Sequence, residues 1–173
     1  MKTDFNWGDD IIDSRSIIAR HEELKEEYES LAEALEEAQH ELGKIKRINE
    51  ELDARDECSA SLDEWEDDID KAQEALDDFN KSFEKDELDT LTEVIAQGED
   101  SPDWSYGETL IKDSYFTQYT QDLIEDTYEV PAELSSGKWP WNHVNVDYES
   151  AADELKSDYI SIDVDGESYW IRA

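Results

Sequence analysis

The sequence predicts an α+β protein that is mostly α-helical, with a long antiparallel αα-hairpin followed by a small helical domain that ends in a β-hairpin. Apolar residues recur every seven residues through the first half of the chain, which is typical of coiled-coil helices. Residues 158–173 alternate apolar and polar side chains around Asp165-Gly166, a dipeptide favoured in two-residue hairpin turns. We therefore expect an acidic helical domain over residues 1–100 and a small α+β domain over residues 101–173.

The first helix is expected within residues 13–57, where Asp13 or Ser14 can cap its start. Its coiled-coil face, called the seam below, consists of two rows of side chains that alternate in steps of three and four. These are Ile17, Leu24, Leu31, Ala38, Ile45 and Leu52 in one row, and His21, Tyr28, Leu35, Leu42 and Asn49 in the other.

A second helix is expected over residues 61–85, with a capping box formed by Ser61 and Glu64 at its start. Its seam residues are Leu62, Trp65, Ile69, Ala72, Leu76, Phe79 and Phe83. A short turn between the two helices gives an antiparallel hairpin. Pairing outward from that turn places Leu31 beside Phe83.

A third, shorter helix is expected over residues 85–100, with Leu88, Leu91 and Ile95 on one face and Gly98 at its end. The first helix is longer than the second, so its start, from Ile17 to Tyr28, needs another cover. Either the C-terminal half or a second copy of the chain can supply it.

The C-terminal half begins after a turn at Pro102. We expect a helix within residues 107–131, whose apolar face is Leu110, Ile111, Tyr115, Tyr119 and Leu123. A short helix follows within residues 145–158, capped by Asp147 and with Ala151, Ala152 and Leu155 facing inward. The terminal hairpin then pairs Ile160 with Ile171, Ile162 with Tyr169, and Val164 with Glu167.

The charge balance points to a basic partner. The chain carries 50 Asp and Glu against 15 Lys and Arg, a net charge of −35. A chain of this charge repels nucleic acid and anionic lipid, so we expect it to bind a basic protein surface and neither of these directly. A hydrophobic content of 37% with six Trp and eight Tyr argues against a wholly disordered chain.

Motifs for catalysis and cofactor binding are missing from the sequence. Its one cysteine, Cys58, excludes an internal disulfide and any site that needs a cysteine cluster. His21, His40 and His143 lack the paired spacing of zinc ligands, and the Asp163–Gly166 stretch does not fit the calcium-loop template. We expect a non-enzymatic protein without metal or cofactor. Because no apolar run or leader pattern is present, we also expect a cytoplasmic location.

The acids of the second helix are the candidate binding residues. One stripe, Asp63, Asp67, Asp70, Glu74 and Asp77, runs along the face opposite the seam, and Glu64, Glu66, Asp68 and Asp78 flank it. Like charges at this spacing repel by about a few tenths of a kcal/mol per pair. Over residues 61–85 the net charge of −7 amounts to one charge per ~5 Å, against ~3.4 Å along one DNA strand. The alternatives are a plain solvated face and a halophilic surface.

The C-terminal half resembles a known family in one pattern. Asp147, Tyr148, Glu149, Ala152, Leu155, Asp158 and Tyr159 form a D-Y-E-x-x-A-x-x-L-x-x-D-Y run, which a turn glycine and an aromatic ending follow. This pattern, within residues 103–173, is similar to the antirestriction (ArdA-type) proteins of phages and mobile elements. The resemblance implies an acidic, non-enzymatic, commonly dimeric mimic of B-form DNA that occupies the DNA site of a restriction enzyme. The predicted αα-hairpin departs from that family's pattern and leaves the target open.

These observations favour a phage-encoded DNA mimic that blocks the DNA-binding site of a host defence nuclease, either a restriction–modification or a CRISPR–Cas complex. The carboxylates of the second helix would take the place of phosphates. Two alternatives stay open: a coiled-coil adaptor whose hairpin binds a partner helix, and an acidic chaperone for a basic nucleic-acid-binding protein.

Overall fold

A computed structural model of the chain describes residues 6–53, 61–129 and 131–173. The chain is mostly helical with one small antiparallel sheet, and its described helices include none long and apolar enough to cross a membrane. It divides into two compact units, residues 20–89 (the hairpin unit) and residues 1–19 with 90–173 (the sheet unit). This division differs from the expected boundary at residue 100, because the first residues join the C-terminal sheet. The expected turn with Cys58 lies outside the described residues.

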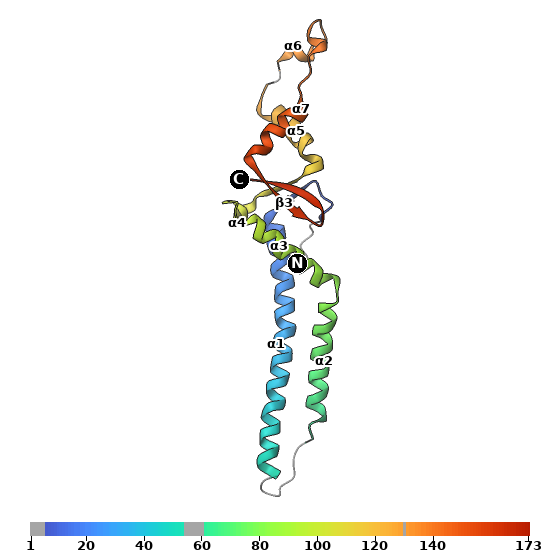
Figure 1. Ribbon diagram of the computed structural model, residues 1–173, viewed down its shortest axis with the longest axis vertical. Coiled ribbons are helices and arrows are strands. Elements are labelled where there is room, and N and C mark those ends of the chain that lie inside the picture. The colour runs from blue at the N-terminus through green and yellow to red at the C-terminus, as the bar shows by residue number, and fades with distance from the viewer. Residues whose placement is uncertain (1–5, 54–60, 130) are drawn as a thin grey trace. The chain divides into compact units, whose positions relative to one another are not determined.

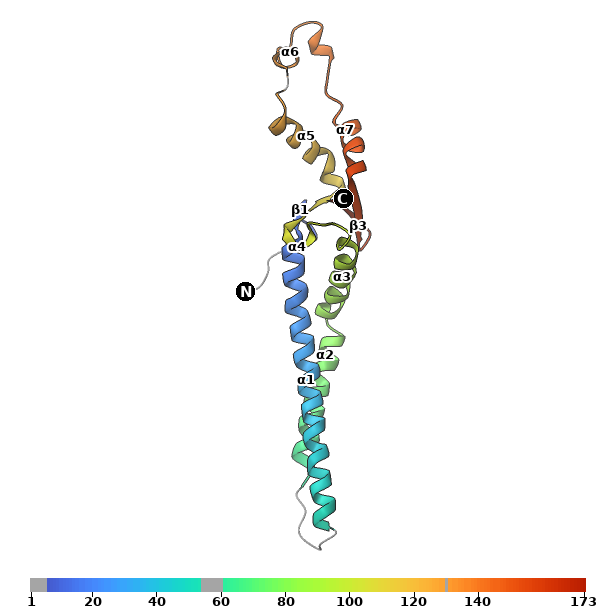
Figure 2. The same ribbon diagram turned by 90° about the vertical axis from the view of Figure 1, so that its left-hand side faces the viewer.

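Two antiparallel helices form the hairpin unit, α1 (Ser14–Asp53) and α2 (Asp63–Asn80), which lie side by side in Figures 1 and 2. Asp13 caps α1 by accepting the backbone N–H of Arg15 at 2.9 Å. The expected seam of α1 is confirmed, since every residue of its two rows is buried or half-buried. The long amphipathic helix is therefore the element that the heptad pattern predicts most directly.

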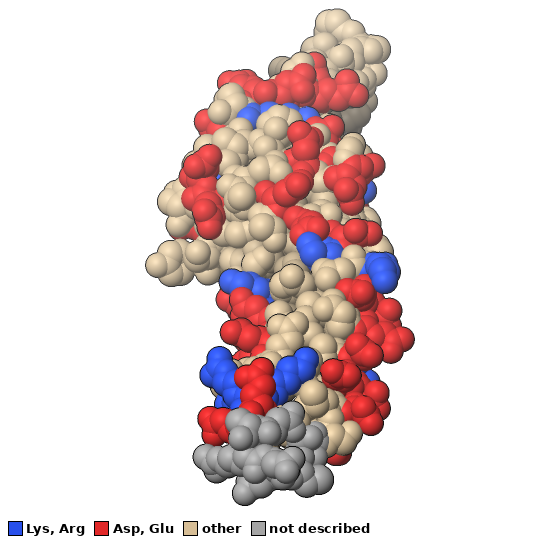
Figure 3. Space-filling view, turned by 60° about the horizontal axis from the view of Figure 1, so that its bottom comes forward, with Lys and Arg blue, Asp and Glu red and all other residues tan. Residues whose placement is uncertain are grey.

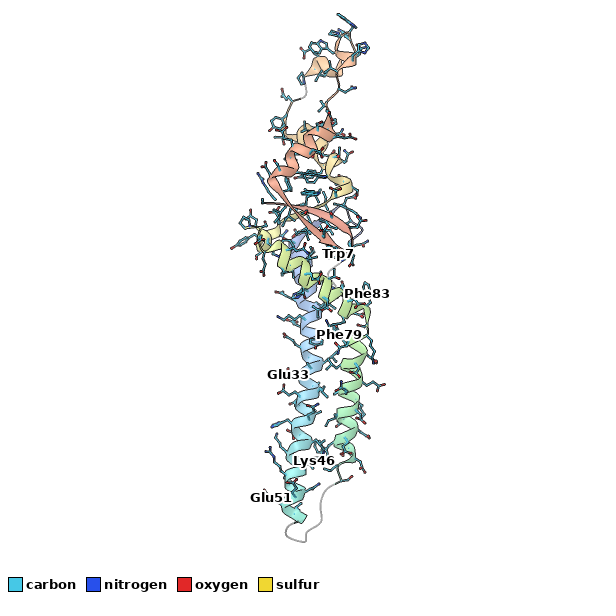
Figure 4. All side chains as sticks on the ribbon, viewed as in Figure 1. Trp7, Glu33, Lys46, Glu51, Phe79 and Phe83 are labelled. Atoms are coloured by element: carbon cyan, nitrogen blue, oxygen red, sulfur yellow. The ribbon has the colours of Figure 1, made fainter. Side chains whose placement is uncertain are left out.

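The expected pairing of Leu31 with Phe83 is wrong. Phe79 is buried, and its ring centroid lies 5.7 Å from that of Tyr28, about one heptad from the expected register. Figure 4 shows Phe79 between the two helices. The register differs because α1 continues past the start of α2 (Figure 1) instead of ending at a tight turn level with it.

The second helix is also shorter than expected. It ends at Asn80, because the hydroxyl and the backbone N–H of Ser82 both donate to the carbonyl of Phe79, at 2.8 and 3.0 Å. Such local side-chain bonds compete with the helical hydrogen-bond pattern. Phe83 begins the next helix, α3 (Phe83–Gly98), and its side chain is 76% exposed.

The cover for the start of α1 comes from the same chain. Arg20 donates from two guanidinium nitrogens to the two carboxylate oxygens of Glu87 on α3, at 3.1 and 2.8 Å, and from a third to Glu23 at 2.7 Å. Leu24 on α1 and Leu88 on α3 are both buried in the hairpin unit. Within this unit, α3 thus covers the start of α1. The sequence analysis had offered two other covers, the C-terminal half and a second copy of the chain.

The sheet unit contains a four-stranded antiparallel sheet in the order β1-β2-β4-β3. Its strands are β1 (Ile11–Asp13), β2 (Thr109–Lys112), β3 (Tyr159–Val164) and β4 (Glu167–Arg172). The expected hairpin is confirmed in its register: Ile160 pairs with Ile171, Ile162 with Tyr169, and Val164 with Glu167. Its turn residues Asp165 and Gly166 have φ of 50° and 87°, the left-handed conformation that the Asp-Gly pair predicts.

The expected helix over residues 107–131 is correct only in its second part. Leu110 and Ile111 belong to β2, and the helix itself, α5, spans Phe116–Thr127. Both strand residues are buried, because adjacent residues of a strand face opposite sides of the sheet and both sides are covered here. Two adjacent buried apolar residues fit a helix face as readily as a doubly covered strand, so the sequence pattern was ambiguous.

One side of the sheet packs against α5 and α7 (Tyr148–Leu155). Phe116 is buried between Ile111 of β2 and Ala152 of α7, and its ring lies edge-on to Tyr159 and Trp170 at 5.1 and 6.0 Å. As expected, Asp147 caps α7 through the N–H of Ser150, at 3.0 Å. The expected inward face of α7 is also confirmed: Ala152 is buried and Ala151 and Leu155 are half-buried.

The other side of the sheet presents Ile12, Leu110, Ile162, Val164, Tyr169 and Ile171, all buried. The remaining buried apolar side chains of this unit come from α1, α3 and α4 (Trp104–Gly107), which form the second core with that side: Ile17, Leu91, Val94 and Trp104. Val94 takes the inward position expected of Ile95, which is only half-buried. The four-residue helix α6 (Ala132–Ser135) and the 3-10 turn η2 (Trp141–His143) connect α5 to α7.

Gly98 ends α3 as expected, but for a different reason from the usual helix cap. A Cβ atom at this position would lie 2.5 Å from the indole ring of Trp104. The helix therefore ends in glycine because the buried tryptophan needs the space. The Gln97 amide just before it bonds the backbone N–H of Asp163 at 3.1 Å and its carbonyl at 3.4 Å, which covers part of the free edge of β3.

An ion pair and a cation–π contact close the sheet core. The Lys156 ammonium lies 2.6 Å from Asp113 and 5.0 Å from the ring centroid of Trp170, whose indole N–H donates to the same carboxylate at 2.7 Å. These two hydrogen bonds hold the pKa of Asp113 below its usual value, the Lys156 contribution being the larger. Lys156 belongs to the 3-10 turn η3 (Lys156–Asp158) and Asp113 to the 3-10 turn η1 (Asp113–Tyr115). The cluster therefore links these two connecting segments to Trp170 of β4.

Phe79 and Phe83 give a matched test of the hairpin. Phe79→Ala should lower the free energy of unfolding by about 3 kcal/mol, because it removes a buried ring from the seam. Phe83→Ala should change it by less than ~0.5 kcal/mol, because that ring is exposed. Urea unfolding followed by circular dichroism at 222 nm measures both. Equal losses would mean that Phe83 packs in the seam after all.

Lys156→Ala should lower the free energy of unfolding by about 1 kcal/mol, since it removes both the ion pair and the cation–π contact. Lys138→Ala is the control, because Lys138 is exposed and its side chain forms no ion pair with the described residues. A Lys156→Ala variant as stable as the control would show that the cluster contributes nothing to the sheet unit.

Candidate functional site

The nine acids expected on the second helix all lie on α2. Eight are exposed: Asp63, Glu64, Glu66, Asp67, Asp68, Asp70, Glu74 and Asp78. Asp77 is half-buried and accepts a hydrogen bond from the amide of Gln73 at 2.8 Å, so it is less available to a partner than the rest. Trp65, Ile69 and Leu76 on the opposite side are half-buried against α1. The amphipathic pattern thus gives α2 one covered side and one anionic side, which we call the acid face.

The observed helix is more densely charged than the expected one. Between Asp63 and Asn80 it carries nine acids and one base, Lys71, for a net charge of −8 in 18 residues. At 1.5 Å per residue this is a length of about 27 Å, or one net charge per ~3.4 Å. Phosphates follow one strand of DNA at the same spacing of ~3.4 Å. The acid face therefore matches the linear charge density of a single nucleic-acid strand.

Few cations neutralise the acid face. Lys71 pairs with Asp68 at 3.1 Å, and Lys46 of α1 reaches Glu66 at 3.9 Å. Both pairs are exposed, where ion pairs contribute little to stability. Among the residues that the structure describes, Asp67, Asp70 and Glu74 form no ion pair. These three carboxylates remain open to a cation from a partner.

The cations of the hairpin unit gather elsewhere. The last turns of α1 carry Lys44, Lys46 and Arg47, and Lys44 pairs with Glu41 of its own helix. Figure 3 shows one group of Lys and Arg in the lower part of the molecule, with acids beside it, and further Lys and Arg in the middle and upper parts. The chain thus has cations near the acid face but places only Lys71 on α2.

A second feature was not singled out by sequence reasoning. A hollow of about 740 Å³ in the sheet unit is lined by three acids of α5 and its C-terminal extension, Glu125, Asp126 and Glu129, and by Tyr128 and Tyr148. The Tyr148 hydroxyl donates to Glu125 at 3.3 Å, and partial desolvation together with that carboxylate raises the pKa of Tyr148. The sequence signal for this hollow is the cluster of three acids around Tyr128 over residues 125–129.

The described part of the chain holds no group of three or more His, Cys, Asp or Glu side chains arranged to bind a metal ion. Of the three histidines, His21 and His40 both lie on α1, and His143 lies in η2.

Comparison with known proteins adds no relative to this description. No family model, no curated protein and no solved structure matches the chain. The similarity of the C-terminal half to antirestriction proteins thus stays a prediction from its sequence pattern.

Proposed function

We propose that the chain is a non-enzymatic DNA mimic that inhibits a nucleic-acid-binding defence complex of a phage host. The observation that supports it best is the charge density of α2, one net charge per ~3.4 Å along an exposed helix side. A solvated helix face does not need this density. A helix selected only for stability would interleave lysines with its acids to remove the repulsion.

In this mechanism the carboxylates occupy the Lys and Arg groups that otherwise contact DNA phosphates. Asp67, Asp70 and Glu74 are the first candidates, because they are exposed and form no ion pair with the described residues. Trp65 and Ile69 hold the helix on α1, so the charges are presented on a folded scaffold and little ordering is needed on binding. The binding free energy is largely electrostatic, so affinity should fall as the salt concentration rises.

A single acid face imitates one strand, not a duplex. The full target surface therefore requires further acids of the chain or a second copy. The antirestriction resemblance favours a dimer. Of the alternatives, the acidic chaperone keeps a basic partner, whereas the adaptor binds a partner helix through its hairpin and does not use the acids for binding. What separates the alternatives is whether the partner loses its DNA when it binds this protein.

The function is tested by plating an unmodified phage on hosts that express the chain. One host carries a restriction–modification system, one a CRISPR–Cas system and one neither. We expect plating efficiency to rise on one defended host and to stay constant on the undefended host. No rise on either defended host would contradict inhibition of these two systems.

Charge reversal tests the acid face itself. The triple variant Asp67→Lys, Asp70→Lys and Glu74→Lys should lose the plating advantage, since it replaces the phosphate-like charges with repelling ones. The matched control reverses Glu99, Asp100 and Asp103, three exposed acids outside the hairpin unit, and changes the net charge by the same amount. Circular dichroism checks that both variants keep their helices. Equal activity of the two variants would remove α2 from the mechanism.

A further inference from the structure

The segment between α5 and α7 differs in composition from the rest of the chain. Residues 134–146 contain no acid, which makes this the longest acid-free run in a sequence with 50 acids. The run includes Lys138 and His143 and two of the six tryptophans. Figure 3 shows the top of the molecule, where α6 lies in Figure 1, as a cap of neutral atoms above a band of acids.

Its apolar side chains face outward. Trp139 is 81% exposed, Trp141 42%, Val144 46% and Val146 37%. Because one Trp side chain buries about 150–250 Å² when covered, the exposed apolar surface here is on the order of a few hundred Å². The largest apolar patch on a typical monomeric protein is of about this size, and it is often functional. Trp is also among the residue types that contribute most binding energy at protein interfaces.

The surroundings of this patch are anionic. Glu125, Asp126 and Glu129 precede it and line the hollow described above, together with Tyr128 and Tyr148. Carboxylates next to aromatic rings bind Lys or Arg side chains through charge-assisted hydrogen bonds and cation–π contacts. The Tyr148 and Gln121 bonds to Glu125 both use Oε1, and no described residue donates a hydrogen bond to the second oxygen. The surface therefore combines an exposed apolar part with an acidic rim on the side of α5.

Charge selects one kind of occupant. A second copy would bring another chain with a net charge of −35 against the acids beside the patch. Anionic lipid surfaces and nucleic acids repel the rim for the same reason. A protein with an apolar pocket bordered by Lys and Arg complements both parts of the surface.

We propose that residues 125–129 and 131–148 bind a partner protein of this kind, with Trp139 and Trp141 entering its apolar pocket and the acid-lined hollow holding one of its Lys or Arg side chains. This inference goes beyond the proposed function and does not depend on it, because it uses no residue of α2. It predicts a second recognition surface on the sheet unit, with specificity that charge alone does not give.

The test uses the full chain labelled with 5-fluorotryptophan, whose six fluorine signals are assigned by single Trp→Phe variants. The probe is a synthetic amphipathic helix with leucines on one face and arginines on the other, added in about 0.5 M NaCl so that exposed charges are largely screened. We expect saturable shifts of the Trp139 and Trp141 signals, while the signal of buried Trp104 stays in place.

Two matched peptides and two variants make the result specific. A peptide with arginines replaced by glutamates, and one with leucines replaced by serines, should cause no shift of Trp139 or Trp141. Trp139→Ala should weaken binding of the amphipathic probe at least about tenfold. Tyr106→Ala should leave it unchanged, because Tyr106 is equally exposed but lies on α4.

Several outcomes would overturn the proposal. Shifts with the leucine-free peptide would mean plain electrostatic binding, and shifts confined to Trp65 would place the peptide on α2. Shifts that grow with protein concentration alone would identify a second copy as the occupant. None of these outcomes affects the plating test of α2, so failure of the two proposals can be told apart.

Discussion

Repulsion among 50 carboxylates, opposed by only 15 basic side chains, is the constraint under which this fold forms. The least exposed cations join separate elements: Arg20 links α1 to Glu87 of α3, Lys112 links β2 to Glu167 of β4, and Lys156 links η3 to Asp113 of η1. Each lies where two elements meet and like charges would otherwise push them apart. This use of cations leaves α2, with Lys71 alone, as the least neutralised helix of the hairpin unit.

The repeating patterns of the sequence predicted the parts of the fold that local rules determine. The heptads gave the seam of α1, Asp147 gave the cap of α7, and Asp165-Gly166 gave the register of the terminal hairpin. What they missed depends on contacts far apart in the sequence. Strand β1 exists because Ile12 pairs with Leu110. The sequence of β2 resembles a helix face because both sides of the sheet are covered, so that adjacent residues of the strand are both apolar and buried. The hairpin register shifted because heptads fix a seam but not the alignment of two helices along it.

In the candidate site, too, the local sequence pattern predicted some features and missed others. Helical periodicity placed all nine acids on α2 and most of them on its exposed side, since a residue opposite a seam must face water. It could not show that Ser82 ends the helix after Asn80, and that early end is what raises the charge density to one per ~3.4 Å. The sequence did not predict the Trp139–Trp141 surface, because aromatic residues in a connecting loop can be buried or exposed. Only the structure shows that these side chains are exposed.

If the chain mimics DNA phosphates as proposed, this protein and DNA compete for one surface of the defence complex. The decisive measurement is the dissociation constant of a fluorescent duplex from the purified complex at increasing concentrations of this chain. We expect the apparent dissociation constant to rise linearly with the chain's concentration, without a plateau, and no complex to contain both ligands. A plateau, or a stable ternary complex of nuclease, duplex and this protein, would contradict phosphate mimicry.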